Sequence, residues 1–235
     1  MSVTWAVDRG SGPVGPGMDV QVAAASTIKL VVATCLWGEV ARGRLDADAS
    51  APTLPVVGDG ALLDVLPGIE PTLAHLCTLM LAVSDNAATN ALLDLLGLDA
   101  VNAEAARLGL RSTRIVRAMH DLDAIAGGRD NRTSAGDLAR ACRALADESL
   151  VPRRTAWRVL EGLRASQHLD VIGEVCPAGR LLACKRGFND QASHDCALVE
   201  SREGPVGVAV CSSPPAASDA LREAARRALA TVGVP

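Results

Sequence analysis

The stretch that decides the fold is Ser26-Thr27-Ile28-Lys29, continued by the apolar run Leu30-Val31-Val32-Ala33-Thr34-Cys35-Leu36-Trp37. Residues 27–40 are helical in length and apolar on nearly every side, which is typical of a helix buried in the centre of a protein. Lys29 follows Ser26 by one turn on the same face, so its amine can reach the hydroxyl. The helix N-terminus offers backbone N–H groups to a developing oxyanion. The stretch predicts a buried central helix with a reactive serine at its start, although Ser26 could also be a simple helix cap.

Lysine is rare in this chain. Only Lys29 and Lys185 occur among its 23 lysine and arginine residues. Arginine stays protonated, whereas a lysine amine can lose its proton when it is buried beside other cations. Keeping lysine at two positions therefore indicates chemistry that a guanidinium cannot perform, although GC-rich coding would also reduce lysine use.

Two further motifs follow along the chain, Ser84-Asp85-Asn86 and Lys185-Arg186-Gly187. The Ser84 hydroxyl could relay a proton toward a leaving group, and the Asn86 amide could hold the lysine or the substrate. The glycine would let a substrate backbone pair along a strand edge, where the N–H of Phe188 could complete an oxyanion hole with that of Ser26. Taken singly, each motif could equally be a helix cap or a strand end.

In this order, the three motifs resemble those of class A β-lactamases and the related penicillin-binding transpeptidases. Their separations fit the class A layout, and the resemblance extends over most of the chain. It includes the segment around Gly109-Leu110 and the stretch Arg129-Asp130-Asn131-x-Thr133-Ser134, which looks like the end of the family's omega loop. The resemblance implies a serine acyl-enzyme with an active site between two lobes and no metal or organic cofactor.

The resemblance also implies a role for each matching residue. By this transfer Ser26 is the nucleophile, Lys29 its base and Ser84 the proton shuttle. The remaining matches order the site or line its edge strand: Asn86, Lys185, Gly187 and Phe188.

The chain departs from the family pattern at two places. Arg186 stands where the family usually has Thr or Ser, so it either binds a substrate carboxylate itself or blocks the usual pocket. The omega-loop glutamate that activates the deacylating water is missing, because no glutamate occurs between Glu104 and Glu148. Spacing places His120 and Asp121 near that position. We expect Asp121 as the first candidate for the deacylation base and His120 as the second, and efficient antibiotic hydrolysis is not expected.

The order of elements predicts an α/β (α+β) fold, β-lactamase/transpeptidase-like, in which helices flank an antiparallel sheet and an all-α lobe is inserted. Residues 1–235 are expected to form one domain, with an α/β lobe at about 1–45 and 165–235 and a helical lobe at about 46–164. A Gly58-Asp59-Gly60 turn interrupts the helical lobe, and Thr133-Ser134-x-x-Asp137 resembles a capping box. The expected strands are 3–8, 181–185, 196–201 and 206–211, and the expected helices are 27–40, 71–82, 87–96, 99–108, 134–146, 152–164 and 217–232.

Composition narrows the function class. Hydrophobic residues make up 49% and charged residues 21%, with a net charge of −4, as in an ordinary soluble globule without a basic field for nucleic acid. No targeting segment and no membrane-length apolar run is visible, so a cytoplasmic location is expected.

The seven scattered cysteines predict buried free thiols rather than disulfides or a zinc site. The four histidines lack metal-ligand spacing, and prolines interrupt the Gly10-x-Gly12-x-x-Gly15 match to a dinucleotide fingerprint.

These observations predict a serine acyl-enzyme hydrolase or acyltransferase that acts on a small amide, ester or lactam. Its partner would be a small-molecule or peptide-like substrate; the oligomeric state is not indicated. Two alternatives stay open: a true β-lactamase, and a catalytically degenerate module that binds a peptide-like ligand in the cleft. The intact serine, lysine and Ser-Asp-Asn motifs argue against degeneracy, whereas Arg186 and the missing glutamate argue for it.

Overall fold

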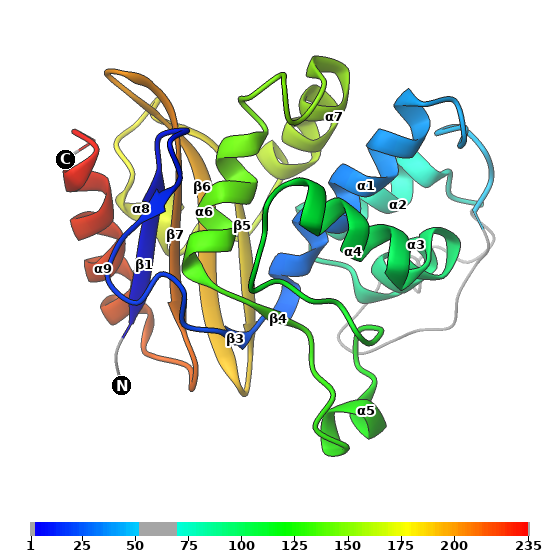
Figure 1. The fold of residues 1–235 in the computed structure, drawn as a ribbon, viewed down its shortest axis with the longest axis horizontal. Helices are drawn as coiled ribbons and strands as arrows, with labels where there is room; N and C mark the ends of the chain where they lie inside the picture. The colour runs from blue at the N-terminus through cyan, green and yellow to red at the C-terminus, as the bar shows by residue number, and fades with distance from the viewer. Residues whose placement is uncertain (1–2, 52–69, 235) are drawn as a thin grey trace.

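The computed structural model describes residues 3–51 and 70–234 of the chain. The predicted Gly58-Asp59-Gly60 turn lies outside these residues. Within them, the fold is α+β, as the sequence predicts: a five-stranded antiparallel sheet with helices on both faces and a group of helices beside its β5 edge (Figure 1). No helix in the described ranges combines the length and the apolar content needed to span a bilayer.

The sheet joins the two ends of the chain. Its strand order is β2-β1-β7-β6-β5, so the N-terminal strand β1 pairs with the last strand, β7, and β5 forms the edge nearest the helices. This order lets the middle of the chain leave the sheet after β1 and return at β5. The strands are β1 (Thr4–Asp8), β2 (Pro13–Val14), β5 (Leu181–Asn189), β6 (Ala192–Ser201) and β7 (Gly204–Ser212).

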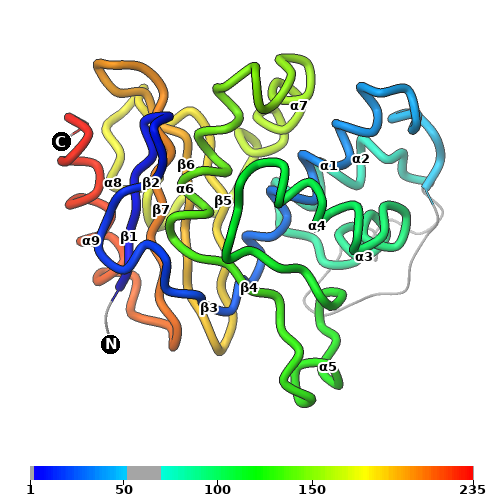
Figure 2. Tube along the Cα trace, in the orientation of Figure 1, coloured from blue at the N-terminus to red at the C-terminus, as the bar shows by residue number. Residues whose placement is uncertain are grey.

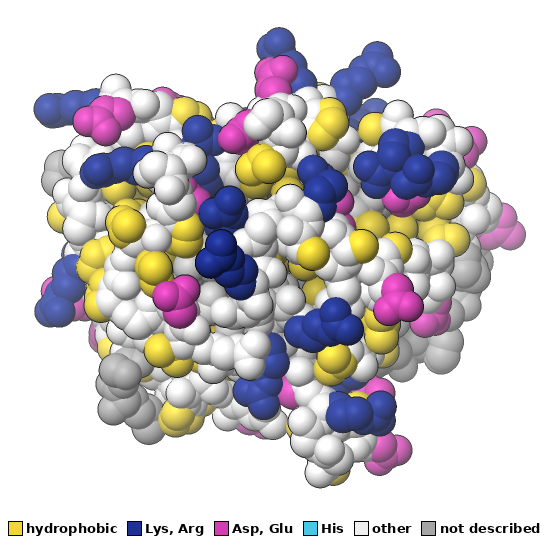
Figure 3. Space-filling model, in the orientation of Figure 1, with side chains coloured by type: hydrophobic (Ala, Val, Ile, Leu, Met, Phe, Trp, Pro, Cys, Tyr) yellow, Lys and Arg dark blue, Asp and Glu magenta, His cyan; other side chains and the backbone are white. Residues whose placement is uncertain are grey.

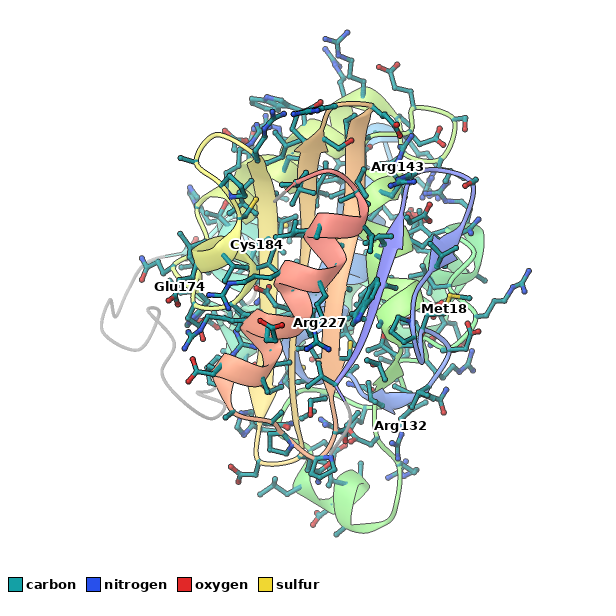
Figure 4. All side chains as sticks on the ribbon, turned by 90° about the vertical axis from the view of Figure 1, so that its left-hand side faces the viewer. Met18, Arg132, Arg143, Glu174, Cys184 and Arg227 are labelled. Atoms are coloured by element: carbon teal, nitrogen blue, oxygen red, sulfur yellow. The ribbon has the colours of Figure 1, made fainter. Side chains whose placement is uncertain are left out.

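Helices cover both faces of the sheet. On one face α9 (Ser218–Thr231) crosses β7 and β1, and the short α8 (Ile172–Val175) lies against α9 and β6. Figure 4 looks onto this face, where Cys184 and Glu174 mark the β5 and α8 side. On the other face α6 (Ala135–Ala144) packs against β7, β1 and β6. Because both faces are covered, nearly every residue of β6 is buried.

The helix expected at residues 27–40 is the centre of the fold. It is observed as a 3-10 turn, η1 (Ala25–Ile28), that continues directly into α1 (Lys29–Ala41), and the first ten residues of α1 are buried. Gly43 ends this segment with a φ of +69°, a conformation that glycine adopts without strain after a helix. The helices around α1 are α2 (Leu73–Ala82), α3 (Asn86–Leu96), α4 (Leu98–Arg107) and α7 (Arg153–Arg164).

Most predicted elements are present with ends shifted by a few residues, and the C-terminal strands are longer than predicted. The extension on β6 consists of Ala192, Ser193, His194 and Asp195, which are all buried. His194 Nε2 lies 2.6 Å from the Ala23 carbonyl oxygen, and Asp195 Oδ2 accepts a hydrogen bond from Ile172 N. Partners far away in the sequence thus make polar residues suitable for a central strand.

The capping segment before α6 was predicted in part. Ser134 is the N-cap of α6, and its Oγ accepts a hydrogen bond from Asp137 N. The Asp137 carboxylate, however, accepts hydrogen bonds from Arg111 N (3.0 Å) and Ser112 N (2.7 Å). The acidic residue of the predicted box therefore anchors a preceding loop to the start of α6.

A loop between α4 and α6 is closed at its neck. Arg117 donates to Asp130 through Nε (2.9 Å) and Nη2 (2.6 Å), and both side chains are buried. The Asn131 side chain bonds the backbone of Val116 and Arg117. A compact loop with adjacent ends is an Ω-loop, as the sequence resemblance implies for this segment. It projects from the body and carries the short helix α5 (Leu122–Ala126) (Figure 2).

The neck of this loop is tied to the segment before Ser26. Strand β3 (Val22–Ala23) pairs with β4 (Arg132–Thr133), and Ala24 N donates to the Asn131 carbonyl oxygen at 2.8 Å. The loop and the start of η1 are therefore held together through main-chain hydrogen bonds.

Candidate active site

Ser26 lies at the second position of η1, between the sheet and the helices. The residue before it, Ala25, has a φ of +47°, and Ser84 has a φ of +60°. Residues with a side chain seldom adopt this left-handed conformation, and strained backbone of this kind occurs preferentially at functional sites. Both serines of the predicted site are thus in or next to strained backbone, while their side chains remain half-buried and open to solvent.

Lys29 is the centre of a dense polar cluster. Its Nζ lies 3.0 Å from Ser26 Oγ, 3.0 Å from Ser84 Oγ, 2.6 Å from the Ser84 carbonyl oxygen and 2.8 Å from Asn86 Oδ1. The lysine side chain itself has no exposed area. The structure therefore brings together the motifs around residues 26 and 84, which lie far apart in the sequence.

The four contacts suit a neutral amine. The Ser84 carbonyl oxygen and Asn86 Oδ1 can only accept, so they take the two N–H groups of an uncharged lysine. The lone pair is then left to accept a hydrogen bond from one of the two hydroxyls. Burial, together with the charge of Lys185, lowers the pKa of Lys29 well below its usual value, and Asp85 opposes this shift only in part. This arrangement can take a proton from Ser26 Oγ.

Lys185 reaches the same cluster from the opposite side. It projects from the edge strand β5, is almost fully buried, and its Nζ donates to Ser84 Oγ at 3.0 Å and to the Arg186 carbonyl oxygen at 2.8 Å. Burial lowers the pKa of Lys185 to about 8. Ser84 Oγ thus lies between two amines, as a proton shuttle requires. Since both lysines are buried, the cationic atoms at the surface in Figure 3 are arginines, and they are spread over several elements.

Gly187 allows β5 to approach η1. A Cβ at this position would lie 2.8 Å from Thr27 Cγ2, 2.9 Å from Thr27 N and 3.0 Å from Ser26 N, closer than real Cβ contacts. Only glycine fits without displacing the start of η1. Phe188 follows and is 57% exposed, so the strand passes beside Ser26 and then presents an aromatic residue to solvent.

Arg186 points away from the two lysines. Its Nε and Nη2 donate to the two carboxylate oxygens of Asp170 at 3.0 and 3.2 Å, and its Nη1 donates to Ser193 Oγ and to the His194 carbonyl oxygen. The guanidinium carbon lies 5.4 Å from the centroid of the Phe188 ring. Sequence reasoning did not identify Asp170, because an aspartate in a loop gives no signal of a distant partner.

Within the part of the chain that the structure describes, the Ω-loop residues predicted for deacylation make no hydrogen bond to the cluster around Lys29. His120 is exposed with a φ of +58°, and Asp121 is the N-cap of α5, where its Oδ1 accepts from Ala124 N at 2.9 Å. Among the hydrogen bonds of the described residues, none joins either side chain to Ser26, Lys29 or Ser84.

Met119 is the loop residue held against the site. Its N–H donates to Asn90 Oδ1 at 2.7 Å, and its carbonyl oxygen accepts from Asn90 Nδ2 at 3.2 Å. Asn90 lies one turn after Asn86 on α3, on the same helix face. This pair was missed, although the spacing of four residues from the Ser-Asp-Asn motif could have indicated it. Within the described ranges, no group of three or more His, Cys, Asp or Glu residues could hold a metal ion.

The sequence profile of the Beta-lactamase enzyme family matches residues 3–232. The chain belongs to this family. No curated protein matches the chain significantly in sequence. Membership and the structural matches below make it a serine hydrolase of the β-lactamase and penicillin-binding-protein type.

Solved structures of this family have the same fold. A beta-lactamase from Sphaerobacter thermophilus DSM 20745 is 28% identical with a TM-score of 0.88, and the alignment covers 100% of this chain and 92% of that one. The last common ancestor of Gram-negative bacteria class A beta-lactamase is 24% identical with a TM-score of 0.87, covering 98% and 93%. A mutant of PBP-A, solved as an acyl-enzyme complex with penicillin G, is 22% identical with a TM-score of 0.85, covering 98% and 90%.

Proposed function

We propose that this protein forms an acyl-enzyme at Ser26 with a small amide, ester or lactam, and passes the acyl group to water or to another acceptor. The observation that carries the proposal is the position of the buried Lys29 amine, 3.0 Å from both Ser26 Oγ and Ser84 Oγ. A degenerate ligand-binding module would not need two desolvated amines around two hydroxyls, since burying them costs stability.

The proposed acylation proceeds through named atoms. Lys29 Nζ takes the hydroxyl proton of Ser26, and Oγ forms a bond to the substrate carbonyl carbon. The negative charge moves to the carbonyl oxygen, which the N–H groups of Ser26 and Phe188 would stabilise. When the bond to the leaving group breaks, its nitrogen or oxygen takes the proton of Ser84 Oγ. Ser84 regains a proton from Lys29, so the site returns to its starting protonation state.

Release of the acyl group needs a second activated nucleophile. Asp121 remains our proposed base for water and His120 the second choice, although Asp121 Oδ1 caps α5 and His120 is exposed. Met119, which cannot act as a base, is the residue held over α3. We therefore expect acylation to be faster than hydrolysis, with acyl transfer to an amine or alcohol favoured over hydrolysis of antibiotics.

Intact-protein mass spectrometry tests the proposal. A fluorophosphonate should add one label at Ser26, and Ser26→Ala should remove that label while the melting temperature is retained. Penicillin should give a stoichiometric burst followed by slow release, and an added amine should accelerate release. Labelling that persists in Ser26→Ala would refute the assignment. Rapid steady-state hydrolysis without a burst would instead favour a true β-lactamase.

A further inference from the structure

A wall of side chains lies beside the cluster around Lys29. The wall consists of His168, Asp170, Arg186 and Phe188. The wall borders the side of Ser84, the proposed proton donor to the leaving group. Gln167, the residue before His168, donates its N–H to the Ala82 carbonyl oxygen, two residues before Ser84.

The wall also reaches the Lys185 side of the cluster. The His168 ring packs edge-on against Phe188 with centroids 5.9 Å apart, and Phe188 follows Gly187, the glycine in contact with Ser26. Residues 167–170 therefore pass between Ser84 and the exposed end of β5.

The positive charge of Arg186, the cation of this wall, is already paired with a carboxylate. An arginine side chain has five N–H donors, and four of those of Arg186 are used, two by Asp170, one by Ser193 and one by His194. The Arg186 side chain is 5% exposed, whereas that of Asp170 is 51% exposed. A substrate that approaches from solvent therefore meets the carboxylate and the Phe188 ring before the guanidinium.

The pair is supported from behind. Arg222 on α9 donates through Nη1 to the Asp170 carbonyl oxygen at 2.9 Å and to Glu174 Oε2 at 2.8 Å. These bonds fix the backbone that carries the carboxylate. Asp170 is consequently held in place by an arginine on each side and is not a freely moving surface residue.

We propose that Asp170 is a specificity-determining residue that closes Arg186 to anions, so that the substrate carries an uncharged apolar group on its leaving-group side. This inference rests on the proposed acylation of Ser26. An anionic leaving group would face the Asp170 carboxylate without a free N–H pair to compensate. An apolar group, in contrast, can pack on the exposed Phe188 ring.

A matched pair of activated esters tests this proposal: meta-acetoxybenzoate, whose leaving group carries a carboxylate, and its methyl ester, whose leaving group is neutral. Second-order rates of Ser26 acetylation are measured for both esters by intact-protein mass. We expect the wild-type protein to react faster with the methyl ester. In Asp170→Ala two N–H groups of Arg186 are freed, so the ratio of the acid rate to the ester rate should rise by at least about tenfold, as a charge-assisted hydrogen bond provides.

Three controls make the outcome decisive. Asp219→Ala removes the carboxylate of another Asp–Arg pair, with Arg222 on α9, and should leave the ratio unchanged. Asp170→Asn keeps the shape of the side chain, and it should shift the ratio in the same direction even if the alanine variant folds poorly. Arg186→Gln combined with Asp170→Ala should abolish the gain.

An unchanged ratio in both Asp170 variants, or a wild-type preference for the acid, would overturn the inference. Fluorophosphonate labelling is run in parallel. Loss of Ser26 labelling in the wild-type protein would overturn the proposed function itself, whereas normal labelling with an unchanged ratio would overturn only the role of Asp170.

Discussion

At the scale of single residues, the proposed chemistry depends on a buried amine, that of Lys29, which arginine could not replace. Lys29 has no exposed area and Lys185 is almost as buried, yet together they contact both serine hydroxyls of the site. A guanidinium would stay charged in the same place. The rarity of lysine in the sequence therefore corresponds to a local requirement for an amine that can lose its proton.

Lys29→Arg tests this requirement. The variant keeps a cation but cannot supply a neutral amine, so the rate of Ser26 acylation by an activated ester should fall by at least about 10²-fold, the effect of losing a positioned general base. Lys185→Arg should be milder, because a charged donor to Ser84 remains. Near-normal acylation in Lys29→Arg would mean that this residue is only a structural cation.

The pH dependence of acylation follows from the same two residues. Lys29 must be neutral to act as the base, so the rate should first rise with pH. A protonated Lys185 gives Ser84 Oγ a charge-assisted hydrogen bond that the neutral amine cannot give, and since burial places its pKa at about 8, that charge is present below this pH and lost above it. Acylation should therefore decline above about pH 8, and Lys185→Arg should remove the decline. A wild-type rate that continues to rise to about pH 10 would contradict this assignment.

At the scale of elements, the Ω-loop carries the residues that we propose for release of the acyl group. Its neck is fixed by the Arg117–Asp130 pair and by the bond from Ala24 to Asn131, and its first turn is fixed by Asn90. These contacts hold the Met119 backbone at Asn90 on α3. Asn90 lies one turn after Asn86, the residue that contacts Lys29. The loop is thus tied to α3 through the backbone of an apolar residue, Met119.

Met119→Glu should change release rather than acylation. Glutamate is close to methionine in length, and a carboxylate at this position could activate water, so the slow phase after a penicillin burst should accelerate by about 10²-fold or more. The burst rate should stay within a small factor of wild type. Met119→Gln, which has the length of glutamate without its carboxylate, is the matched control and should leave the slow phase unchanged. Equal release in the two variants would argue against this position of Met119.

At the scale of the whole molecule, the sheet and its helices must approach closely for the site to form. Gly207 on β7 shows how close: a Cβ there would lie 1.8 Å from the Ala139 carbonyl oxygen on α6. Because α6 follows directly after β4, which pairs with β3 before Ser26, displacement of α6 would also move the nucleophile.

Gly207→Ala should therefore lower both stability and activity. Overpacking of this kind costs about 1–3 kcal/mol or more, so the free energy of unfolding, measured in urea, should fall by an amount in this range or above it. Gly38→Ala is the control, since the nearest atom to a Cβ there is the flexible end of Arg42 and the position is helical. That variant should be neutral or slightly stabilising. A Gly207→Ala protein as stable as Gly38→Ala would disprove the close contact.

Much of the fold and the central cluster could be predicted from the sequence. A helix that is apolar on all sides must be buried, and a serine and a lysine one turn apart on it must lie close together. The order of strand-like and helical runs was sufficient to predict the antiparallel sheet and most helices. The spacing of apolar residues along each run reflects which face of the element is buried. The division into lobes and the cytoplasmic location stay predictions.

Only the tertiary structure decided which distant side chains meet. The polar residues of β6 lie in the core because Ala23 and Ile172 supply their partners, and Arg186 is closed to anions because Asp170, from another loop, binds it. The Ω-loop is tied to α3 through the Met119 backbone, because the Asn90 amide binds both its N–H and its carbonyl oxygen. Hydrogen bonds and ion pairs between segments depend on three-dimensional placement, which no local pattern of residues encodes.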